Sequence, residues 1–406
     1  MADQKLLPVD EALSRVLARA SLLGEETVAI DAAQGRTLAH HLIATRTQPP
    51  VAVSAMDGYA VRTNDFPTDA GLRLVGESAA GHGYGGVLNP GETVRIFTGA
   101  PVPEGADAVV LQENVTTDGG IVHPVETVLI GENIRAAGLD FRAGTAGLKA
   151  GTRLGAAELA LAAAMNHARL PVARRPRVAL LASGDELVPP GAEPGPAQII
   201  ACNSFAVAAI ARDAGAETID LGLFPDTIEE LERGVQLARA AQADVLVTLG
   251  GASVGDHDLL RPALARQGMA LDFWKIAMRP GKPLIHGSLG QTHILGLPGN
   301  PVAAYVCALV FLGPLIRALQ GDPDAAADRS ETVVAGAALP ANKGRRDYMR
   351  ARLSADAHGR QVATPQPLQD SSLLTELQQS QALLIREPLA PALSAGDAVR
   401  ILRLPT

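Results

Sequence analysis

The pattern of hydrophobic and polar positions changes several times along the 406-residue chain. A helix near the N-terminus is predicted by apolar residues at helical spacing: Val9, Leu13, Val16, Leu17 and Ala20. From about residue 27 to 150, short β-runs alternate with Gly and Pro turns, and helical periodicity is absent. A second helix is predicted at 156–168, and the stretch RLPVARRPR at 169–177 is interpreted as a linker.

The stretch 177–320 alternates regularly between strands and helices. Strands are predicted at 177–184, 218–224, 244–251, 271–277 and 293–297. Helices are predicted at 203–215, 226–242 and 258–268, and a long helix is predicted from Asn300. Such alternation predicts a parallel sheet that helices cover on both faces. Beyond residue 327 the β-runs return and predict a small barrel or sandwich.

We therefore expect a multidomain α/β protein. The predicted domains are an N-terminal region with helical and β-rich subdomains at 1–175, a doubly wound α/β domain at 176–326 and a C-terminal β domain at 327–406. Since a domain typically has ~150 residues, a chain of 406 residues is expected to contain about three domains.

Composition and charge exclude several classes of protein. The formal net charge of −8, without a block of like charge, argues against a nucleic-acid partner. The two cysteines form neither a disulfide framework nor a zinc-binding CxxC pair. The N-terminus lacks a signal-peptide apolar region, and the longest apolar run, near 306–316, is too short to span a membrane and is broken by Gly313-Pro314. We expect a cytoplasmic protein without a membrane partner.

Unusual loops follow the strands of the α/β domain. In open α/β sheets, ligands bind outside the carboxyl ends of the strands. Five loops rich in glycine and charged residues are expected at that edge. They are 183–186, 224–227, 250–258, 279–283 and 297–301. Glycine turns in them suit a phosphorylated ligand held by backbone N–H groups, with Arg279 and Lys282 as counter-charges.

The acids in the same loops suggest a divalent cation. A phosphate would be repelled by Asp185, Asp226 and Asp256 unless an oxygen-loving ion such as Mg²⁺ lay between them. Each acid alone is better explained as a helix N-cap or turn former. The confinement of all five loops to one edge favours the ligand site.

Other patterns in the sequence suggest no chemistry. The stretch GHGYGG at 81–86 satisfies GxGxxG, but no βαβ unit follows it, so we interpret it as a glycine loop. The histidines never adopt HxxxH spacing, and neither a GxSxG elbow nor a Cys with a plausible His partner is present. Covalent catalysis therefore has no candidate nucleophile.

An ordered set of motifs resembles a known family. The motifs are SAMDGYAVR at 54–62, FTGAPVP at 97–103, GENIRAAGLD at 131–140, LASGDEL at 181–187, LGGASVGDHD at 249–258, RPGKP at 279–283, LGLPGNPVA at 295–303 and GRRDYMRARL at 344–353. Together they resemble the MoeA family of molybdopterin molybdenumtransferases, which is related to the C-terminal domain of gephyrin.

The resemblance implies a reaction and an assembly. Members of the family take adenylylated molybdopterin and molybdate, release AMP and leave molybdenum on the pterin, with a divalent cation that is usually Mg²⁺. They act as homodimers whose cleft combines the α/β domain of one subunit with the N-terminal domain of the other. The α/β domain resembles molybdopterin adenylyltransferase, which is a possible partner together with molybdoenzyme maturation proteins.

Site residues carry over by position, and three roles are expected. The expected catalytic residues are Asp57, Thr98, Asp140, Glu186 and Lys282. The expected substrate-binding residues are Ser183, Gly250, Gly251, Ser253, Arg279, Gly281, Pro298, Pro301, Arg350 and Ser371. The expected metal ligands are Glu186, Asp226 and Asp258. Asp57 also has a simpler explanation, as a turn residue before Gly58.

Two other functions remain open from the sequence. One is a molybdopterin adenylyltransferase built on the same α/β domain, although such an enzyme would not need the AMDGYA and TGAPVP regions. The other is a non-enzymatic scaffold, for which a fused second enzyme domain or a long linker would be the expected sign.

Overall fold

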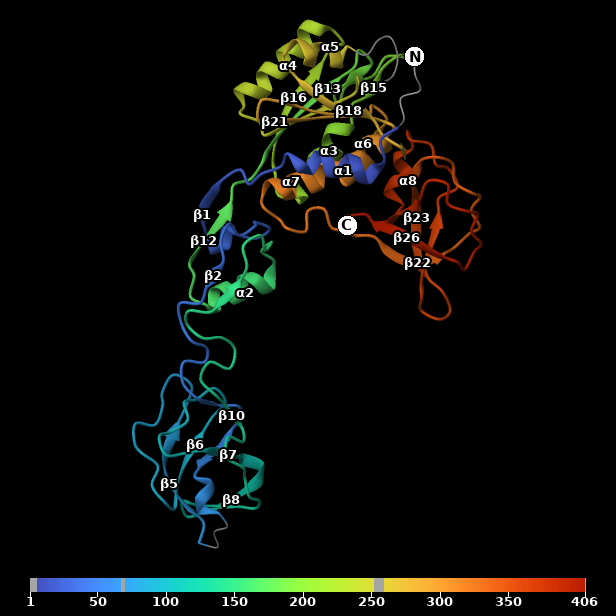
Figure 1. Ribbon diagram of the computed structural model, residues 1–406. Helices are drawn as coiled ribbons and strands as arrows, with labels where there is room; N and C mark the ends of the chain where they lie inside the picture. Colours follow the sequence, from blue (N-terminus) through green and yellow to red (C-terminus); the bar gives the residue numbers. More distant parts are fainter. Residues whose placement is uncertain (1–5, 67–69, 252–258, 406) are drawn as a thin grey trace. The chain divides into compact units, whose positions relative to one another are not determined.

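The computed structural model describes residues 6–66, 70–251 and 259–405 (Figure 1). The chain forms two compact units. Unit 1 comprises Met1–Glu26, Gly35–Ala39 and Val172–Thr406, and unit 2 comprises Thr27–Gln34 and His40–Pro171. Unit 1 thus contains the α/β domain and the C-terminal β domain, and unit 2 contains most of the N-terminal region.

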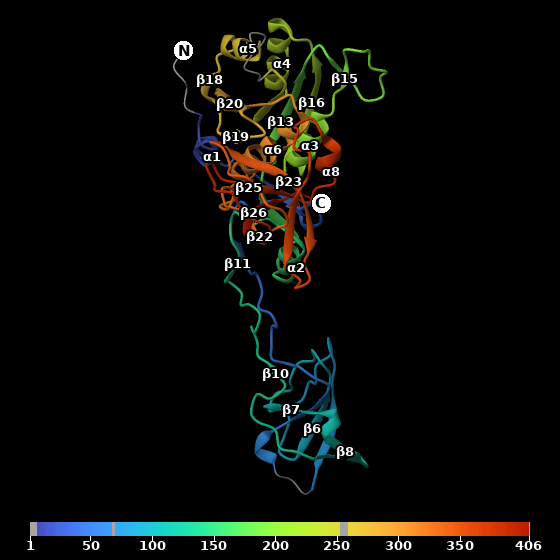
Figure 2. The ribbon, with the colours of Figure 1, turned by 90° about the vertical axis from the view of Figure 1, so that its right-hand side faces the viewer.

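A six-stranded sheet forms the centre of the α/β domain (Figure 2). Its strands, in spatial order, are β16 (Glu217–Phe224), β13 (Arg177–Ser183), β17 (Val245–Leu249), β21 (Thr292–Leu297), β20 (Pro283–Leu289) and β18 (Ala270–Lys275). A two-stranded ladder of β14 (Leu187–Val188) and β15 (Ile199–Ile200) lies outside it.

The prediction of a parallel sheet is correct for only part of this sheet. β16, β13, β17 and β21 are parallel, whereas β20 is antiparallel to both β21 and β18. β20 was not predicted from the sequence pattern. No helix separates β18, β20 and β21 along the chain, and short connections join antiparallel neighbours because a parallel pair needs a long crossover.

Helices cover both faces of the sheet, as the alternating pattern predicted. One core cluster joins the sheet to α1 (Val9–Ala18), α3 (Asn203–Asp213), α6 (Pro301–Cys307) and α7 (Gly313–Leu319). A second cluster joins the opposite face to α4 (Ile228–Ala240) and α5 (Leu260–Arg266). In α1 the predicted apolar face is confirmed, since Val9 and Val16 are buried.

The apolar run near 306–316 is not broken by Gly313-Pro314. α6 continues through a π-helical segment, Ala308–Leu312, directly into α7, and Pro314 lies in the first turn of α7. A π-helical turn accommodates a residue that lacks an N–H donor. The resulting segment Pro301–Leu319 has the length and composition of a membrane span, but 72% of its most apolar window is buried inside the protein. Its hydrophobicity is therefore that of a core helix.

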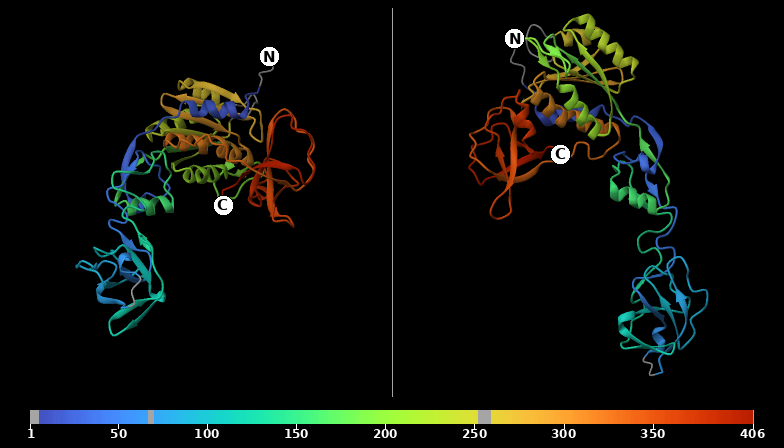
Figure 3. Two further views of the ribbon diagram at one scale, coloured as in Figure 1. Left: turned by 60° about the horizontal axis from the view of Figure 1, so that its bottom comes forward. Right: turned by 180° about the vertical axis from the view of Figure 1, so that it is seen from behind.

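The C-terminal domain is a closed barrel, which is one of the two predicted architectures (Figure 3). Its strands are β22 (Glu331–Ala335), β23 (Arg346–Ala355), β24 (Gln361–Pro365), β25 (Ala382–Arg386) and β26 (Ala398–Arg403). β23 pairs with both β24 and β25, and this double pairing closes the ring. β24 and the short helix α8 (Leu374–Gln378) were not predicted from the sequence.

Unit 2 is β-rich, as predicted. Its main sheet consists of β7 (Ala108–Leu111), β4 (Gly58–Val61), β6 (Glu92–Ile96), β5 (Leu72–Ser78), β9 (Ile121–Pro124) and β8 (Val115–Asp118). Two small ladders join β3 (Val53–Ser54) to β10 (Ile134–Arg135) and β2 (Leu42–Ile43) to β11 (Ala146–Leu148). The glycine stretch 81–86 connects β5 directly to β6, which confirms that no βαβ unit follows it.

The predicted linker at 169–177 is wrong. Residues Arg169–Ala173 form β12, which pairs with β1 (Glu25–Ala29), and β13 already begins at Arg177. Leu170 and Val172 alternate into a buried face, a β-pattern that the neighbouring proline and arginines obscured. The preceding helix, α2 (Ala156–Ala164), ends four residues before the predicted boundary.

Candidate functional site

The flagged loops of the α/β domain lie at one edge of the sheet. Four of them follow parallel strands whose last residues are in register: Ser183 is paired with Phe224, Ala182 with Leu249, and Leu249 with Leu297. The segments after β13, β16, β17 and β21 therefore start side by side. We call this edge the rim.

The 279–282 segment reaches the rim through antiparallel strands. Since β20 runs opposite to β21 and β18, its first residue, Pro283, is paired with Lys275 at the end of β18, and Ile285 is paired with Gly296 near the end of β21. A hydrogen bond of 3.0 Å from the Ile276 amide to the Lys282 carbonyl closes the base of the loop. The rim was thus predicted correctly, although the sheet is not wholly parallel.

Three carboxylates gather after β13 and β16. The Asp226 amide donates a 3.1 Å hydrogen bond to Asp185 Oδ1. Burial raises the pKa of Asp226, the Ser183 hydroxyl partly offsets this, and the charges of Asp185 and Glu186 raise the pKa further. Ser183 Oγ is itself buried and has no partner with ordinary hydrogen-bond geometry among the described residues. A cation placed among these oxygens would relieve the repulsion that raises the pKa.

Glycine is required where the chain leaves β17. Gly250 has φ +97°, and a Cβ there would lie 2.4 Å from the Ser183 carbonyl oxygen. Gly251 also has a positive φ, and its added Cβ would approach the Leu260 side chain. The two glycines therefore allow the backbone after β17 to pass close to the end of β13, at the place where a ligand would meet its amides.

The cationic loop presents two different cations. Arg279 is half exposed and forms an ion pair with Asp347 of the C-terminal domain. Lys282 is partly buried, and no acidic partner is recorded for it within the described part of the chain. Gly281, with φ +107°, packs so tightly against Cys307 that a Cβ would lie 2.5 Å from Sγ. The loop therefore has a fixed path, and its ammonium group has no acidic partner among the described residues.

The loop after β21 is held from two sides. Asn203 Nδ2 donates to the Gly299 carbonyl at 2.7 Å, and Asn300 Nδ2 donates to Ser371 Oγ at 2.8 Å. The Ser371 carbonyl also accepts from the Val302 amide at 3.0 Å. Pro298 and Pro301 lie within this fastened segment. Ser371 thus contacts the loop after β21 and supports it, and its predicted role in substrate binding stays a prediction.

Arg350 is placed differently from an ordinary substrate-binding arginine. It is 1% exposed, and its guanidinium donates to the carbonyls of Leu373 and Leu368 at 2.9 and 3.0 Å. Burial lowers its pKa, because desolvation disfavours the cation. The side chain spans the two ends of the segment that carries Ser371. This geometry favours a positioning role for Arg350 over direct contact with the substrate.

Asp57 and Thr98 meet in unit 2. The backbone amide and hydroxyl of Thr98 both donate to Asp57 Oδ1, at 2.7 and 2.8 Å. These two bonds, with a smaller contribution from Arg95, hold the pKa of Asp57 below its usual range. Arg95 is fixed between Tyr59 and Phe97, whose ring centroids are 5.0 and 4.9 Å from its Cζ. Asp57 is therefore an oriented carboxylate.

Met56 and Asp140 are both exposed in unit 2. Met56, which precedes Asp57 in the chain, is 47% exposed. Asp140 lies in the same unit at an exposed position, where its amide donates to the Gln48 carbonyl at 3.0 Å. Its carboxylate has no recorded bond to Asp57 or Thr98.

Part of the predicted metal site is outside the described residues. Ser253 and Asp258 belong to the stretch 252–258, which is not described. Among the residues that are described, no group of three or more His, Cys, Asp or Glu side chains is arranged to hold a metal ion. Glu186 and Asp226 carry the oxygen donors that Mg²⁺ prefers, and their role as metal ligands stays a prediction.

One acid beside the rim was not predicted from the sequence. Asp347 lies on β23, outside the α/β domain, and pairs with Arg279. In the sequence, Asp347 is visible only as an acid that follows two arginines in GRRDYMR. The two-residue period of the strand puts it on the face that points into the barrel. That pattern indicates that Asp347 is buried, but it does not identify Arg279 as its partner.

Comparisons with known proteins cover nearly the whole chain. Residues 7–166 match a family profile described as MoeA N-terminal region (domain I and II). Residues 179–318 match a probable molybdopterin binding domain, and residues 332–404 match the MoeA C-terminal region (domain IV). The three matches follow one another in the order of the predicted domains.

Individual relatives agree with these matches. A molybdopterin molybdenumtransferase of Haemophilus influenzae is 34% identical over 398 residues, which are 98% of each chain. A Nostoc protein of the same name is 40% identical over 304 residues, 73% of this chain and 70% of the relative. A solved structure of a molybdopterin biosynthesis MoeA protein from Pyrococcus horikosii has a TM-score of 0.81 at 28% identity, covering 98% of this chain and 99% of that one.

Proposed function

Because this chain belongs to the MoeA family and is a molybdopterin molybdenumtransferase of molybdenum cofactor biosynthesis, we propose that its rim binds adenylylated molybdopterin and molybdate. Cleavage of the pyrophosphate linkage would release AMP and leave molybdenum on the pterin. The observation that carries the proposal is the convergence of glycine turns, two cations and clustered carboxylates at one sheet edge. Each of these features matches a part of such a ligand.

Each group at the rim has a chemical task in this proposal. Pyrophosphate cleavage builds negative charge on phosphoryl oxygens, and Lys282, which has no acidic partner in the described part of the chain, neutralises that charge. Gly250 and Gly251 let backbone amides approach the same oxygens. Arg279 binds an oxyanion beside them through the donors that Asp347 leaves free.

A divalent cation fits the donor chemistry of the rim. Asp226 and Glu186 supply carboxylate oxygens, and their mutual repulsion is the kind of strain that Mg²⁺ binding removes. When bound, the ion would neutralise charge that develops on the phosphoryl oxygens. Asp258 completes the proposed ligand set.

We also propose that the protein acts as a homodimer with composite clefts. The residues assigned to the reaction are divided: Asp57, Thr98 and Asp140 belong to unit 2, and the rim belongs to unit 1. From the resemblance to the MoeA family, we expect the N-terminal domain of one subunit to lie against the α/β domain of the other. In this arrangement Asp57, held by Thr98, faces the phosphoryl groups of the ligand that is bound at the rim of the other subunit.

The alternatives from the sequence no longer compete. A free-standing adenylyltransferase would lack counterparts to the N-terminal and C-terminal MoeA regions, and both regions match here. Full-length relatives carry the name of the transferase, which also decides against a purely non-enzymatic scaffold.

The metal assignment is tested by Mg²⁺ titration of AMP release. Single-turnover assays with adenylylated molybdopterin and molybdate would compare the wild type with Glu186→Gln and Asp226→Asn. Loss of a ligand should raise the Mg²⁺ concentration for half-maximal rate by on the order of tenfold or more, since even outer-sphere partners of metal ligands matter that much.

The matched control is Glu217→Gln, at the start of β16 and so at the opposite edge of the sheet from Asp226. Its titration should coincide with that of the wild type, and a chelator should stop AMP release in both. Superimposable Mg²⁺ titrations for the wild type and both ligand variants would refute the assignment.

A further inference from the structure

The cationic loop of the rim is joined to the C-terminal barrel by its backbone. A two-residue strand, β19 (Met278–Arg279), pairs in parallel with β23, so that Met278 is opposite Arg346 and Arg279 is opposite Asp347. The Arg346 amide donates to the Ala277 carbonyl at 2.8 Å. The barrel therefore forms part of the scaffold that carries Arg279.

Asp347 reaches from that barrel strand to the guanidinium of Arg279. The whole residue is 4% exposed, and Arg279 Nη2 donates to its Oδ2. Burial raises the pKa of Asp347, whereas the charges of Arg279, Arg345 and Arg386 lower it. A buried carboxylate of this kind is stable only with its cation in place, so the two side chains fix each other.

Arg279 keeps donors for a ligand despite this ion pair. Its side chain is 53% exposed, and the recorded bond uses only Nη2. A guanidinium has five N–H donors in a rigid fork, so the edge that faces solvent can still bind an oxyanion. Asp347 thus holds one side of the fork and orients the other.

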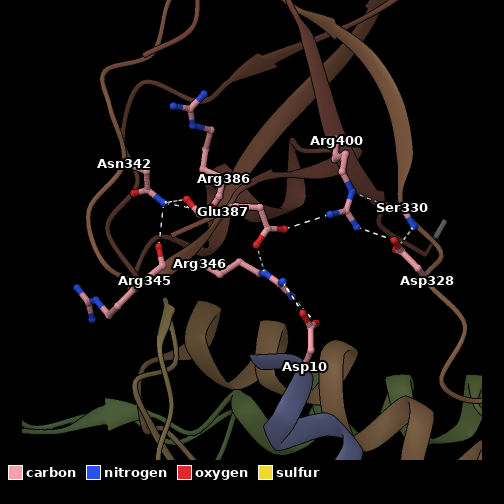
Figure 4. Close-up of polar contacts among 9 residues, drawn as sticks. All are labelled: Asp10, Asp328, Ser330, Asn342, Arg345, Arg346, Arg386, Glu387 and Arg400. Atoms are coloured by element: carbon pink, nitrogen blue, oxygen red, sulfur yellow. Dashed lines mark hydrogen bonds and ion pairs between the residues drawn. The ribbon is translucent and has the colours of Figure 1, made fainter. Parts of the chain in front are cut away.

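The strand that carries Asp347 is fastened independently of Asp347. Arg346 donates to both carboxylate oxygens of Asp10 on α1, at 2.7 and 2.8 Å, and to Glu387 at 2.7 Å (Figure 4). Arg400 bonds Glu387 and Asp328 on the other side of the same network. Removing the charge of Asp347 would therefore leave β23 in place and would mainly change the orientation of the Arg279 guanidinium.

We infer that Asp347 is a positioning residue for oxyanion binding: it orients the Arg279 guanidinium at the rim, so that the C-terminal domain takes part in substrate binding. The inference rests on the proposed role of Arg279. The oxyanion is either molybdate or a phosphate of the adenylylated pterin, since both present the oxygens that a guanidinium edge recognises.

Two opposing effects follow from removing the charge of Asp347, and the orientation effect is the larger. Loss of a negative charge would strengthen attraction for an anion, but Arg345 and Arg386 already compensate much of that charge. Loss of the ion pair releases a long, half-exposed side chain whose rotamer freedom opposes binding. Asp347→Asn should therefore raise KM for the oxyanion that Arg279 binds by about tenfold, with little change in kcat.

A double-mutant cycle tests this. KM and kcat would be measured for Asp347→Asn, Arg279→Gln and the double variant, with molybdate and adenylylated molybdopterin varied in separate arms. If Asp347 acts through Arg279, the Asp347→Asn effect should fall below about twofold in the Arg279→Gln background, and the arm that responds identifies the oxyanion. Asp347→Glu, which keeps the charge but displaces it, should give a smaller KM increase that Arg279→Gln also removes.

The matched control is Asp10→Asn, which removes a carboxylate from the neighbouring arginine of β23 without touching Arg279. It should leave both KM values within about twofold of the wild type. An unchanged or lower KM in Asp347→Asn, or an equal increase in both backgrounds, would overturn the positioning role. An Arg279→Gln variant with wild-type kinetics in both arms would instead overturn the proposed role of Arg279.

Discussion

At the scale of single residues, two buried histidines in the α/β sheet have unsatisfied nitrogens. His286 on β20 bonds Asp272 through Nδ1 at 3.0 Å, but its Nε2 has no recorded partner in the described chain, and neither does Nδ1 of His293 on β21. Burial, reinforced by the charges of His286 and Arg19, lowers the pKa of His293 to about 4. His293 is therefore neutral in the folded protein across the physiological range.

This pair makes the domain sensitive to acid. The folded pKa of His293 is below the unfolded value of about 6.5, so the unfolded chain binds more protons between these values. Stability should be flat above pH ~7 and should fall as pH drops from ~6.5 toward 4, by on the order of 2–3 kcal/mol. His293→Leu should remove most of this slope. The measurement is urea unfolding at several pH values, followed by fluorescence of the sole tryptophan, Trp274, on β18 of the same sheet.

The control for the acid effect is His82→Gln, since His82 is exposed in unit 2. It should keep the wild-type slope. The same slope in His293→Leu and in the wild type would contradict the assignment, and the acid sensitivity would then belong to other groups.

At the scale of elements, the path of the 279–282 loop depends on the lack of a side chain at Gly281. Gly281→Ala forces a positive φ on a residue with a Cβ and presses that Cβ against Cys307 and Met278. The strain and the overpacking together should cost about 2–5 kcal/mol and displace Arg279, so KM for its oxyanion should rise. Thermal unfolding and steady-state kinetics of the purified variant measure the two effects.

Gly290→Ala is the matched control for that loop. Gly290 also has a positive φ, in the turn between β20 and β21, but an added Cβ there meets no atom within 4 Å. It should show only the backbone strain, about 1–2 kcal/mol, with normal KM. If Gly281→Ala is no less stable than Gly290→Ala, contact with Cys307 does not determine the path of the loop.

The elements show why sequence reasoning located the rim and still missed part of the sheet. Buried strands and amphipathic helices have local patterns, so β13, β16, β17 and their helices could be predicted. The apolar run of β20 carries no sign of strand direction, because direction is set by connection length and by pairing partners. The 279–282 loop reached the predicted edge because two antiparallel reversals bring the chain back to it.

Contacts between distant segments were beyond local patterns. The hydrophobic periodicity of the sequence does not predict the contact between Thr98 and Asp57, which lie 41 residues apart. It does not predict the contact between Asp347 and Arg279 either, which lie 68 residues apart. The family resemblance named Asp57 and Thr98 but not their hydrogen bonds, and it gave Arg350 a role that its buried guanidinium does not favour. The residue types of the site could thus be predicted from the sequence, whereas their hydrogen-bond and ion-pair partners are known only from the fold.

At the scale of the whole molecule, each compact unit contributes a different kind of chemistry. Unit 2 provides an oriented carboxylate at Asp57, whose pKa is lowered by two bonds from Thr98. Unit 1 provides glycine amides, cations and carboxylates at the rim, and its barrel supports two of the rim loops through Asp347 and Ser371. Neither unit alone carries all the groups assigned to the reaction, which is the reason to propose clefts shared between subunits.

Mixing two inactive chains tests that proposal. A heterodimer of Asp57→Ala and Lys282→Ala subunits would contain one cleft with both changes and one cleft with neither. Random pairing should then restore about a quarter of the wild-type rate of AMP release, because half of the dimers are heterodimers with one intact cleft. Mixing Arg279→Ala with Lys282→Ala is the control: both changes are at the rim of unit 1, so each cleft keeps one defect. Activity in the test mixture that stays at the level of the separate chains, after subunit exchange is verified by mass spectrometry, would show that each cleft is built within one chain.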